Sequence, residues 1–151
     1  MQSRMQNPAV LVPAAMKALH DLSKAHHSSS LPRRTQELVQ LRVSQINGCS
    51  VCADSHAAGL KEAGETDKRL FTLACWRDTP YFTEAERAAL ALAEAVTRIA
   101  DRPDPVPDAI WDEATRHYDE AAMADLLLDI ASINVWNRLN VATRQVAGVW
   151  R

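Results

Sequence analysis

The arrangement of apolar and polar positions along the chain lacks the alternating runs, bounded by turn residues, that are typical of β-strands. Alanine, leucine, glutamate and arginine dominate long stretches instead, and only four glycines interrupt them. These four abundant residue types are good helix formers, whereas glycine is not. The pattern therefore predicts an all-α fold.

Helix breakers and capping residues divide this pattern into about six or seven helices. The expected helices are residues 13–27, 32–47, 49–63, a short one from 67 that carries Cys75 and Trp76, 83–100, one from about 108, and 120–146. Asp67 is expected to cap the fourth helix, and Thr83 with Glu86 has the spacing of a capping box for the fifth. A break is expected at 28–30 and a proline-rich loop at 101–107.

Gly48 and Gly64 are expected to end the second and third helices, because glycine readily adopts the left-handed conformation found after helix C-termini. If the chain reverses at Gly48, these two helices form a hairpin. The whole chain, residues 1–151, has the usual length of one domain, and no internal repeat is visible.

Composition and charge exclude several classes of protein. Hydrophobic residues make up 47% of the chain and charged residues 24%, and the net charge is −2. A near-neutral charge predicts no partnership with nucleic acid, and the absence of a long apolar run predicts no membrane span. The N-terminus lacks the features of a secretory signal, so a cytoplasmic location is expected.

Candidate chemistry enters with the cysteines, of which there are three. In a reducing compartment a close cysteine pair is more often catalytic or metal-binding than structural. Cys49, Cys52 and His56 are three and four residues apart, so they share one face of a helix. Three residues advance ~4.5 Å along a helix, which places the two cysteine Cα atoms within the separation of a disulfide. The spacing is that of a redox dithiol.

A helix N-terminus favours the thiolate of Cys49, but not strongly enough to act alone. An ordinary thiol with a pKa near 8.5 is only ~3% thiolate at pH 7, and a thiolate that dominates needs ~2.7 kcal/mol. The helix terminus supplies ~0.3–1 kcal/mol, so a base or a cation must help.

His56 can reach Cys52 directly or through one water. Glu37 lies ~16 Å before Gly48 and His56 ~12 Å after it, so a hairpin would bring them within about one turn. Glu37 is therefore expected to be the terminal base and orienter of a proton relay.

These residues resemble the alkylhydroperoxidase AhpD-like core family of the carboxymuconolactone decarboxylase superfamily. The family pattern is a glutamate, eleven residues, Cys-x-x-Cys, three residues and a histidine, which Glu37, Cys49, Cys52 and His56 match without a gap. The sequences around Glu37 and at 136–140 also look like the family, so the resemblance covers roughly residues 10 to 148. This combination is far more specific than a lone Cys-x-x-Cys.

The resemblance implies a thiol-dependent peroxidase that reduces organic or hydrogen peroxides. Cys52 would attack the peroxide as a thiolate and become a sulfenic acid, and Cys49 would resolve it to a disulfide. Glu37 and His56 would move the proton. No bound cofactor is expected; an external dithiol reductant of the lipoyl type would reset the pair. The family also implies homo-oligomers, commonly trimers or hexamers, and members that serve a partner peroxiredoxin.

One position departs from the family pattern. Some members have a second histidine between the cysteines, where this chain has Val51, so a relay group is absent and the peroxidase rate is affected more than the redox chemistry. True carboxymuconolactone decarboxylases share the fold but lack the cysteine pair, which argues against lactone decarboxylation. A non-enzymatic oligomeric redox adaptor or stress sensor, carrying electrons as disulfide and dithiol, is the alternative function.

Other interpretations of the polar and sulfur-bearing residues remain open. Idle core cysteines are one alternative. Zinc is another, with Cys49, Cys52, His56 and Cys75 as nominal ligands, although three residues on one helical stripe converge poorly on a metal. Cys75 lies in an apolar run and is expected to be packed. The remaining histidines are expected to be surface or capping residues: His20, His26, His27 and His117. Three asparagines are expected to fix a subunit interface rather than line a pocket: Asn134, Asn137 and Asn140.

Overall fold

The computed structural model describes residues 1–26 and 31–148, and over these ranges it is helical without strands, which confirms the predicted fold class. The α-helices of this part of the chain are α1 (Pro8–Leu11), α2 (Pro13–His26), α3 (Arg33–Asn47), α4 (Ser50–Glu62), α5 (Asp67–Thr72), α6 (Glu84–Thr97), α7 (Asp108–His117) and α8 (Glu120–Thr143). Two 3-10 helices, η1 (Leu73–Asp78) and η2 (Ile99–Asp101), follow α5 and α6.

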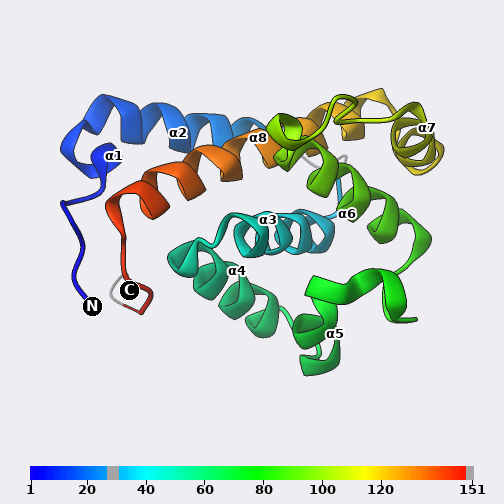
Figure 1. The fold of residues 1–151 in the computed structure, drawn as a ribbon, viewed down its shortest axis with the longest axis horizontal. Coiled ribbons are helices and arrows are strands. Elements are labelled where there is room, and N and C mark those ends of the chain that lie inside the picture. The colour runs from blue at the N-terminus through cyan, green and yellow to red at the C-terminus, as the bar shows by residue number, and fades with distance from the viewer. Residues whose placement is uncertain (27–30, 149–151) are drawn as a thin grey trace.

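Helix α3 lies at the centre of the molecule and packs against α4, α6 and α8 (Figure 1). The long α8 runs beside α2 along one side of the molecule. The two termini lie at the same end in Figure 1, where the backbone N–H of Arg4 donates to the carbonyl of Thr143 at 2.9 Å. The start of the chain is thereby attached to the end of α8.

The predicted hairpin of α3 and α4 is present, and its turn is built on Gly48. This residue has a φ of 69°, in the left-handed region that favours glycine. The N–H of Cys49 donates to the carbonyl of Ser44 at 3.0 Å, which satisfies a carbonyl at the end of α3. Cys49 then serves as the N-cap of α4, so the end of one helix and the start of the next are only two residues apart.

The core is formed by aliphatic side chains of the central helices, with fully buried members on α3, α6 and α8: Leu38, Val39, Val43, Leu90, Leu92, Leu126 and Ile130.

A buried carboxylate, that of Glu94, links helices beside the core. Glu94 of α6 accepts from Arg42 of α3 at 2.7 Å and from Trp76 of η1 at 3.0 Å. Burial would raise the pKa of Glu94, but hydrogen bonds from Arg77, Trp76 and Arg42 outweigh it and lower that pKa. Glu94 therefore links these helices as a charged carboxylate.

Several predicted boundaries are wrong by a few residues. Helix α1 was not predicted, α6 ends at Thr97 rather than residue 100, and α8 ends at Thr143 rather than 146, where Arg144 takes a left-handed φ of 54°. The N-cap of α5 is Thr66, whose hydroxyl accepts from the N–H of Arg69, and not Asp67. The predicted capping box of Thr83 and Glu86 is confirmed. The predicted break at 28–30 lies outside the described residues.

The prediction that Cys75 is packed is also wrong, because its side chain is exposed. The α-helix expected there ends at Thr72 and continues as the 3-10 helix η1. Cys75 itself has non-helical torsions, with φ −122° and ψ 35°. The three-residue period of η1 buries Leu73 and Trp76, and this leaves Cys75 on the outside.

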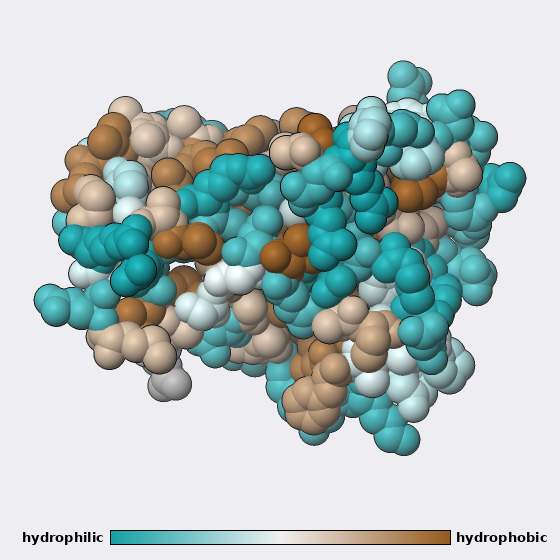
Figure 2. Space-filling view, in the orientation of Figure 1, coloured by the Kyte–Doolittle hydropathy of each residue, from teal (hydrophilic) through white to brown (hydrophobic). Residues whose placement is uncertain are grey.

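The surface is unevenly hydrophobic. In the view of Figure 2, brown and tan atoms gather over α1 and the start of α2, where Leu11 and Val12 are exposed, whereas polar residues dominate over α6 and α7. Among the described residues, no helix has the length and apolar character needed to cross a membrane.

Candidate active site

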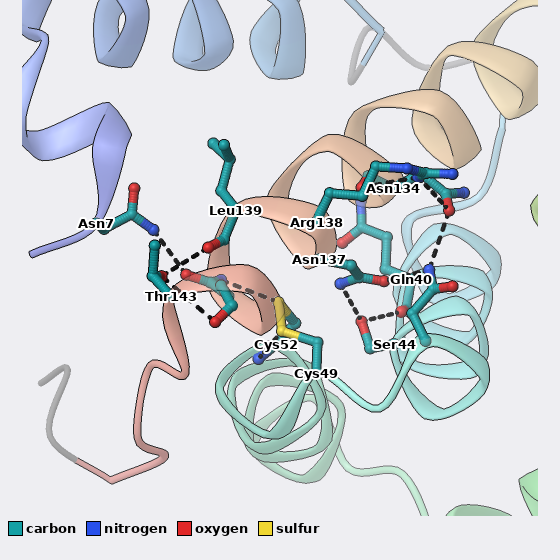
Figure 3. Close-up of a disulfide and its surroundings, with 12 residues drawn as sticks. Asn7, Gln40, Ser44, Cys49, Cys52, Asn134, Asn137, Arg138, Leu139 and Thr143 are labelled. Atoms are coloured by element: carbon teal, nitrogen blue, oxygen red, sulfur yellow. Dashed lines mark hydrogen bonds between the residues drawn. A yellow bond between two sulfur atoms is a disulfide. The ribbon is translucent and has the colours of Figure 1, made fainter. Parts of the chain in front are cut away.

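A disulfide between Cys49 and Cys52 lies at the start of α4 (Figure 3). Their Cα atoms are 5.4 Å apart, as the helical spacing predicts. The sulfur of Cys49 accepts from the backbone N–H of Cys52 at 3.3 Å, so it takes the place of an N-cap oxygen. Both cysteines are buried, Cys49 at 2% exposure and Cys52 at 5%. The pair therefore occupies a sheltered position at the positive end of a helix dipole.

Glu37 and His56 meet across the α3–α4 hairpin, with His56 Nδ1 2.9 Å from Glu37 Oε2. Both side chains are about one-fifth exposed. This contact confirms the proximity predicted from their distances to Gly48. If Nδ1 donates to the carboxylate, the Nε2 nitrogen of His56 is the one left to accept a proton from another group. The roles of the two residues in a relay stay a prediction.

Cys52, Glu37 and His56 line one cavity of about 690 Å³. Its apolar lining comes from α4, α8 and the segment before α3: Leu31, Pro32, Val51, Ile133 and Trp136. Its polar lining includes Gln36, Gln40, Ser55 and Asn140. Cys49 lines a different cavity, together with Gly48 and Arg144. Glu37 and His56 also line a neighbouring cavity of about 1130 Å³ to which Cys52 does not contribute. The pair therefore shares one of its two cavities with Cys52 and none with Cys49.

Asn140 of α8 reaches the disulfide, which sequence reasoning missed. Its Nδ2 donates to the sulfur of Cys52 at 3.2 Å, and its Oδ1 accepts from Nδ2 of Asn7 at 2.7 Å. Asn140 also lines the cavity beside Cys52, which was the other interpretation of the three asparagines. The only signal in the sequence was the three-residue spacing of the asparagines on this helix.

The other two asparagines of α8 have a structural role within the chain, and a role at a subunit interface stays a prediction. Asn47 Nδ2, at the end of α3, donates to Oδ1 of Asn134 at 3.0 Å and to Oδ1 of Asn137 at 2.9 Å. Asn137 Nδ2 donates in turn to the hydroxyl of Ser44 at 3.1 Å. These bonds fasten α8 to α3 and fix the position of Asn140 one turn further along.

A second group of buried polar residues adjoins the cavity through Gln40, which is part of its lining. The side chain of Asp129 has no exposed surface and accepts a hydrogen bond from Nε2 of Gln40, and Nδ1 of His26 lies 3.6 Å from its Oδ1. Burial raises the pKa of Asp129 to about 7; the Gln40 hydrogen bond lowers it in part, and the charges of Glu37 and Asp125 raise it further. A lone aspartate inside the apolar run 126–130 was the signal that could have revealed this group.

The prediction for His26 is therefore wrong, because this histidine is fully buried rather than at the surface. The predictions for His20 and His117 are confirmed, since both are exposed. His20 stacks at a tilt on Trp136, and Nε2 of His117 lies 3.2 Å from Glu113 on α7. His27 lies outside the described residues.

The nominal zinc ligands do not come together. Cys49 and Cys52 are bonded to each other, while Cys75 is exposed on η1. Over residues 1–26 and 31–148, no group of three or more histidine, cysteine, aspartate and glutamate side chains has an arrangement that could hold a metal ion.

Known proteins resemble this chain in sequence. The model of the carboxymuconolactone decarboxylase family matches residues 13–95. The uncharacterized protein YdfG of Bacillus subtilis (strain 168) is 39% identical over 132 residues, which are 87% of this chain and 88% of YdfG.

Solved structures resemble the chain in fold. A protein of unknown function from Agrobacterium tumefaciens, for which a role as the antioxidant defence protein AhpD has been suggested, superposes with a TM-score of 0.90 at 34% identity, covering 98% of this chain and 99% of that one. The debrominase Bmp8 in complex with 2,3,4-tribromopyrrole superposes with a TM-score of 0.81 at 21% identity, covering 92% of this chain and 73% of that one. The second likeness shows a common fold alone.

Proposed function

This chain belongs to the carboxymuconolactone decarboxylase family, and we propose that within it the protein acts as a thiol-dependent peroxidase of the AhpD type. The observation that carries the proposal is the geometry around Cys52. This cysteine is paired with Cys49 in a disulfide and shares a cavity with the hydrogen-bonded pair Glu37 and His56. A redox dithiol beside a proton acceptor is what the reduction of a peroxide requires.

In the oxidative half of the reaction, Cys52 is the attacking thiol. Its proton passes to His56, directly or through a water in the cavity, and Glu37 holds the resulting imidazolium by the Nδ1 contact. The thiolate attacks the peroxide, the O–O bond breaks, and Cys52 becomes a sulfenic acid. The leaving alkoxide takes the proton from His56 and departs as an alcohol, or as water when the substrate is hydrogen peroxide.

Cys49 completes the oxidative half. Its thiol attacks the sulfenic sulfur of Cys52, water leaves, and the disulfide of the present structure forms. The separation of the Cα atoms, 5.4 Å, lies in the ordinary range for disulfides, so the backbone can stay in place. An external dithiol, of the lipoyl type in this proposal, then supplies two electrons and is itself oxidised to a disulfide.

The lining of the cavity supports organic hydroperoxides as substrates. Val51, Ile133 and Trp136 give it an apolar wall beside Cys52. An apolar wall binds an alkyl chain better than it binds hydrogen peroxide, because burying the chain removes apolar surface from water. Cumene hydroperoxide is therefore expected to be turned over with a lower KM than hydrogen peroxide.

The proposal is tested by measuring hydroperoxide consumption with dihydrolipoamide as the electron donor. Cys52→Ser is expected to abolish turnover. Without dithiol in the assay, Cys49→Ser is expected to consume one equivalent of peroxide and to stop as the sulfenic acid of Cys52, which dimedone labels. Glu37→Gln and His56→Asn are expected to lower kcat by ~100-fold or more, because each removes a part of the general acid–base pair.

A matched control exists in the same chain. Glu113 and His117 also form a carboxylate–imidazole contact, 3.2 Å long, but on the surface of α7. Glu113→Gln and His117→Asn are expected to leave turnover unchanged. If the parent protein consumes no peroxide with any dithiol while its disulfide is reduced and reoxidised, the peroxidase proposal fails and the redox adaptor takes its place.

A further inference from the structure

We propose that Asn140 is a further catalytic residue, whose amide holds the thiolate of Cys52, and that Asn7 is a positioning residue that fixes the direction of this amide. The inference rests on the proposed function for the identity of Cys52 as the attacking thiol. It assigns a task to two asparagines that lie outside the Glu–Cys–Cys–His pattern, one on α8 and one before α1.

The contact of Asn140 with the reacting sulfur joins distant parts of the chain. Asn140 Nδ2 lies 3.2 Å from Cys52 Sγ although 88 residues separate them in sequence. Both residues are buried and line the same cavity. In the disulfide form the donor is already within hydrogen-bond distance of the sulfur on which charge appears when the disulfide opens. No movement of α8 is needed to stabilise that charge.

An asparagine amide can present either its oxygen or its nitrogen to a neighbour, and only the nitrogen stabilises a thiolate. Asn7 decides between the two. Its Nδ2 donates to Oδ1 of Asn140 at 2.7 Å, which occupies the oxygen and turns Nδ2 of Asn140 toward the sulfur. In Figure 3, Asn7 and Cys52 both point toward the end of α8, from different parts of the chain.

Asn7 is itself held in one orientation. Its Oδ1 accepts from the backbone N–H of Ala9 at 2.8 Å, as the N-cap of α1, so its Nδ2 must face away from that helix and toward Asn140. Asn7 is only 2% exposed, so water does not compete for these bonds. The sequence of donors runs from Ala9 to Asn7, from Asn7 to Asn140 and from Asn140 to Cys52, with each bond orienting the next.

The site has a need for such a donor. Val51, between the cysteines, carries no polar group, and a helix terminus alone cannot make the thiolate dominant at pH 7. A hydrogen bond from a neutral amide to a buried charged group changes the population of the charged form by ~10-fold or more. Asn140 therefore supplies a large part of what separates Cys52 from an ordinary thiol.

The test measures the rate of alkylation of Cys52 by iodoacetamide against pH, in a Cys49→Ser background. In this background Asn140→Leu keeps the size of the side chain and removes the donor. Its alkylation midpoint is expected to move up by about one pH unit, and alkylation well below the midpoint to slow by ~10-fold. An unchanged midpoint in a folded Asn140→Leu protein overturns the proposal.

Asn7→Asp tests the positioning role separately. Aspartate keeps the N-cap of α1 but cannot donate to Oδ1 of Asn140, and its carboxylate attracts the amide nitrogen away from the sulfur. The midpoint is expected to rise here too, and this variant decides the question if Asn140→Leu does not fold. A midpoint equal to that of the background protein shows that Asn7 does not orient Asn140.

Asn137→Ala is the control for damage to α8. Its amide is fully buried and lies one turn from Asn140, but it donates to Ser44 and not to sulfur. This variant is expected to lose thermal stability without a change in the alkylation midpoint; an equal shift would make the effect of Asn140 merely structural and overturn the proposal. Because alkylation needs no peroxide, the role of Asn140 and the peroxidase function can fail independently.

Discussion

Asp129 is the least expected residue of the structure, a carboxyl group without solvent exposure inside the longest helix. The groups that face it are Gln40 and Glu37 of α3, His26 at the end of α2, and Asp125 one turn earlier on α8. Burial dominates, and it raises the pKa of Asp129 from 3.8 to about 7. The folded protein therefore keeps a proton that the unfolded chain releases near pH 4.

This proton makes stability depend on pH in a defined direction. Below about pH 4 both states are protonated and the stabilisation is fully present; it is lost as the pH rises through about 7. Asp129→Asn stays neutral and can still accept from Gln40. We expect this variant to be more stable than the parent at pH 8 by roughly 1–4 kcal/mol, with little gain at pH 4.5. Urea unfolding at the two pH values checks this, and an equal effect at both contradicts it.

Single residues of the site divide into those that sequence could reveal and those that it could not. Glu37 and His56 were predictable because both are counted along helices from one turn, so their separation follows from the helical rise. Asn140 and the His26–Asp129 contact were not, because they depend on how α8 and α2 pack on the hairpin. Sequence spacing carries no information on contacts between separate helices until their packing is known.

At the scale of elements, substituting alanine for each of two glycines of the hairpin is expected to change the free energy of unfolding in opposite directions. Gly59 lies inside α4, and a Cβ there would meet only Oε2 of Glu37, at 3.8 Å, which is an ordinary contact. Gly59→Ala is expected to raise the free energy of unfolding by ~0.5–1 kcal/mol, because alanine loses less backbone entropy in a helix.

Gly48 provides the comparison. Nothing lies within 4 Å of a Cβ built there, but its φ of 69° is unfavourable for any residue with a side chain. Gly48→Ala is expected to lower the free energy of unfolding by ~1–2 kcal/mol through backbone strain alone. Thermal unfolding measures the stability of both variants. If both substitutions change the stability in the same direction, the conformations assigned to these two glycines are contradicted. Peroxide turnover in Gly59→Ala also reports whether the neighbourhood of Glu37 tolerates a methyl group.

The prediction of elements succeeded where breakers are strong and failed where helices are short. Gly48 marked the end of α3, and the capping box at Thr83 marked the start of α6. The four-residue helix α1 gave no signal, because one turn is too short for a pattern of apolar positions to develop. The change to a 3-10 helix at Leu73 altered the period from 3.6 to about three residues, and the predicted burial of Cys75 failed with it.

At the scale of the molecule, α8 carries an apolar surface that the described part of the chain leaves open. Exposed apolar residues recur on one side of this helix at intervals of three and four: Ala121, Ala124, Leu128, Ala131 and Val135. The other sides of α8 are buried, with Leu126 and Ile130 facing the core. An exposed apolar stripe on a helix whose opposite side already faces the core is normally covered by a partner, and this spacing is that of a helix–helix seam.

We expect this seam to hold copies of the chain together, in the trimers or hexamers that the resemblance to AhpD-like proteins implies. Leu128→Glu with Val135→Glu places two like charges on the seam and is expected to give a monomer, measured by size-exclusion chromatography with light scattering. Leu11→Glu is the comparison, because Leu11 lies in the other exposed apolar region, over α1. Dissociation by Leu11→Glu alone would place the interface at α1. A parent protein that is monomeric at micromolar concentration would contradict self-association, and the seam on α8 would then need a partner of a different kind.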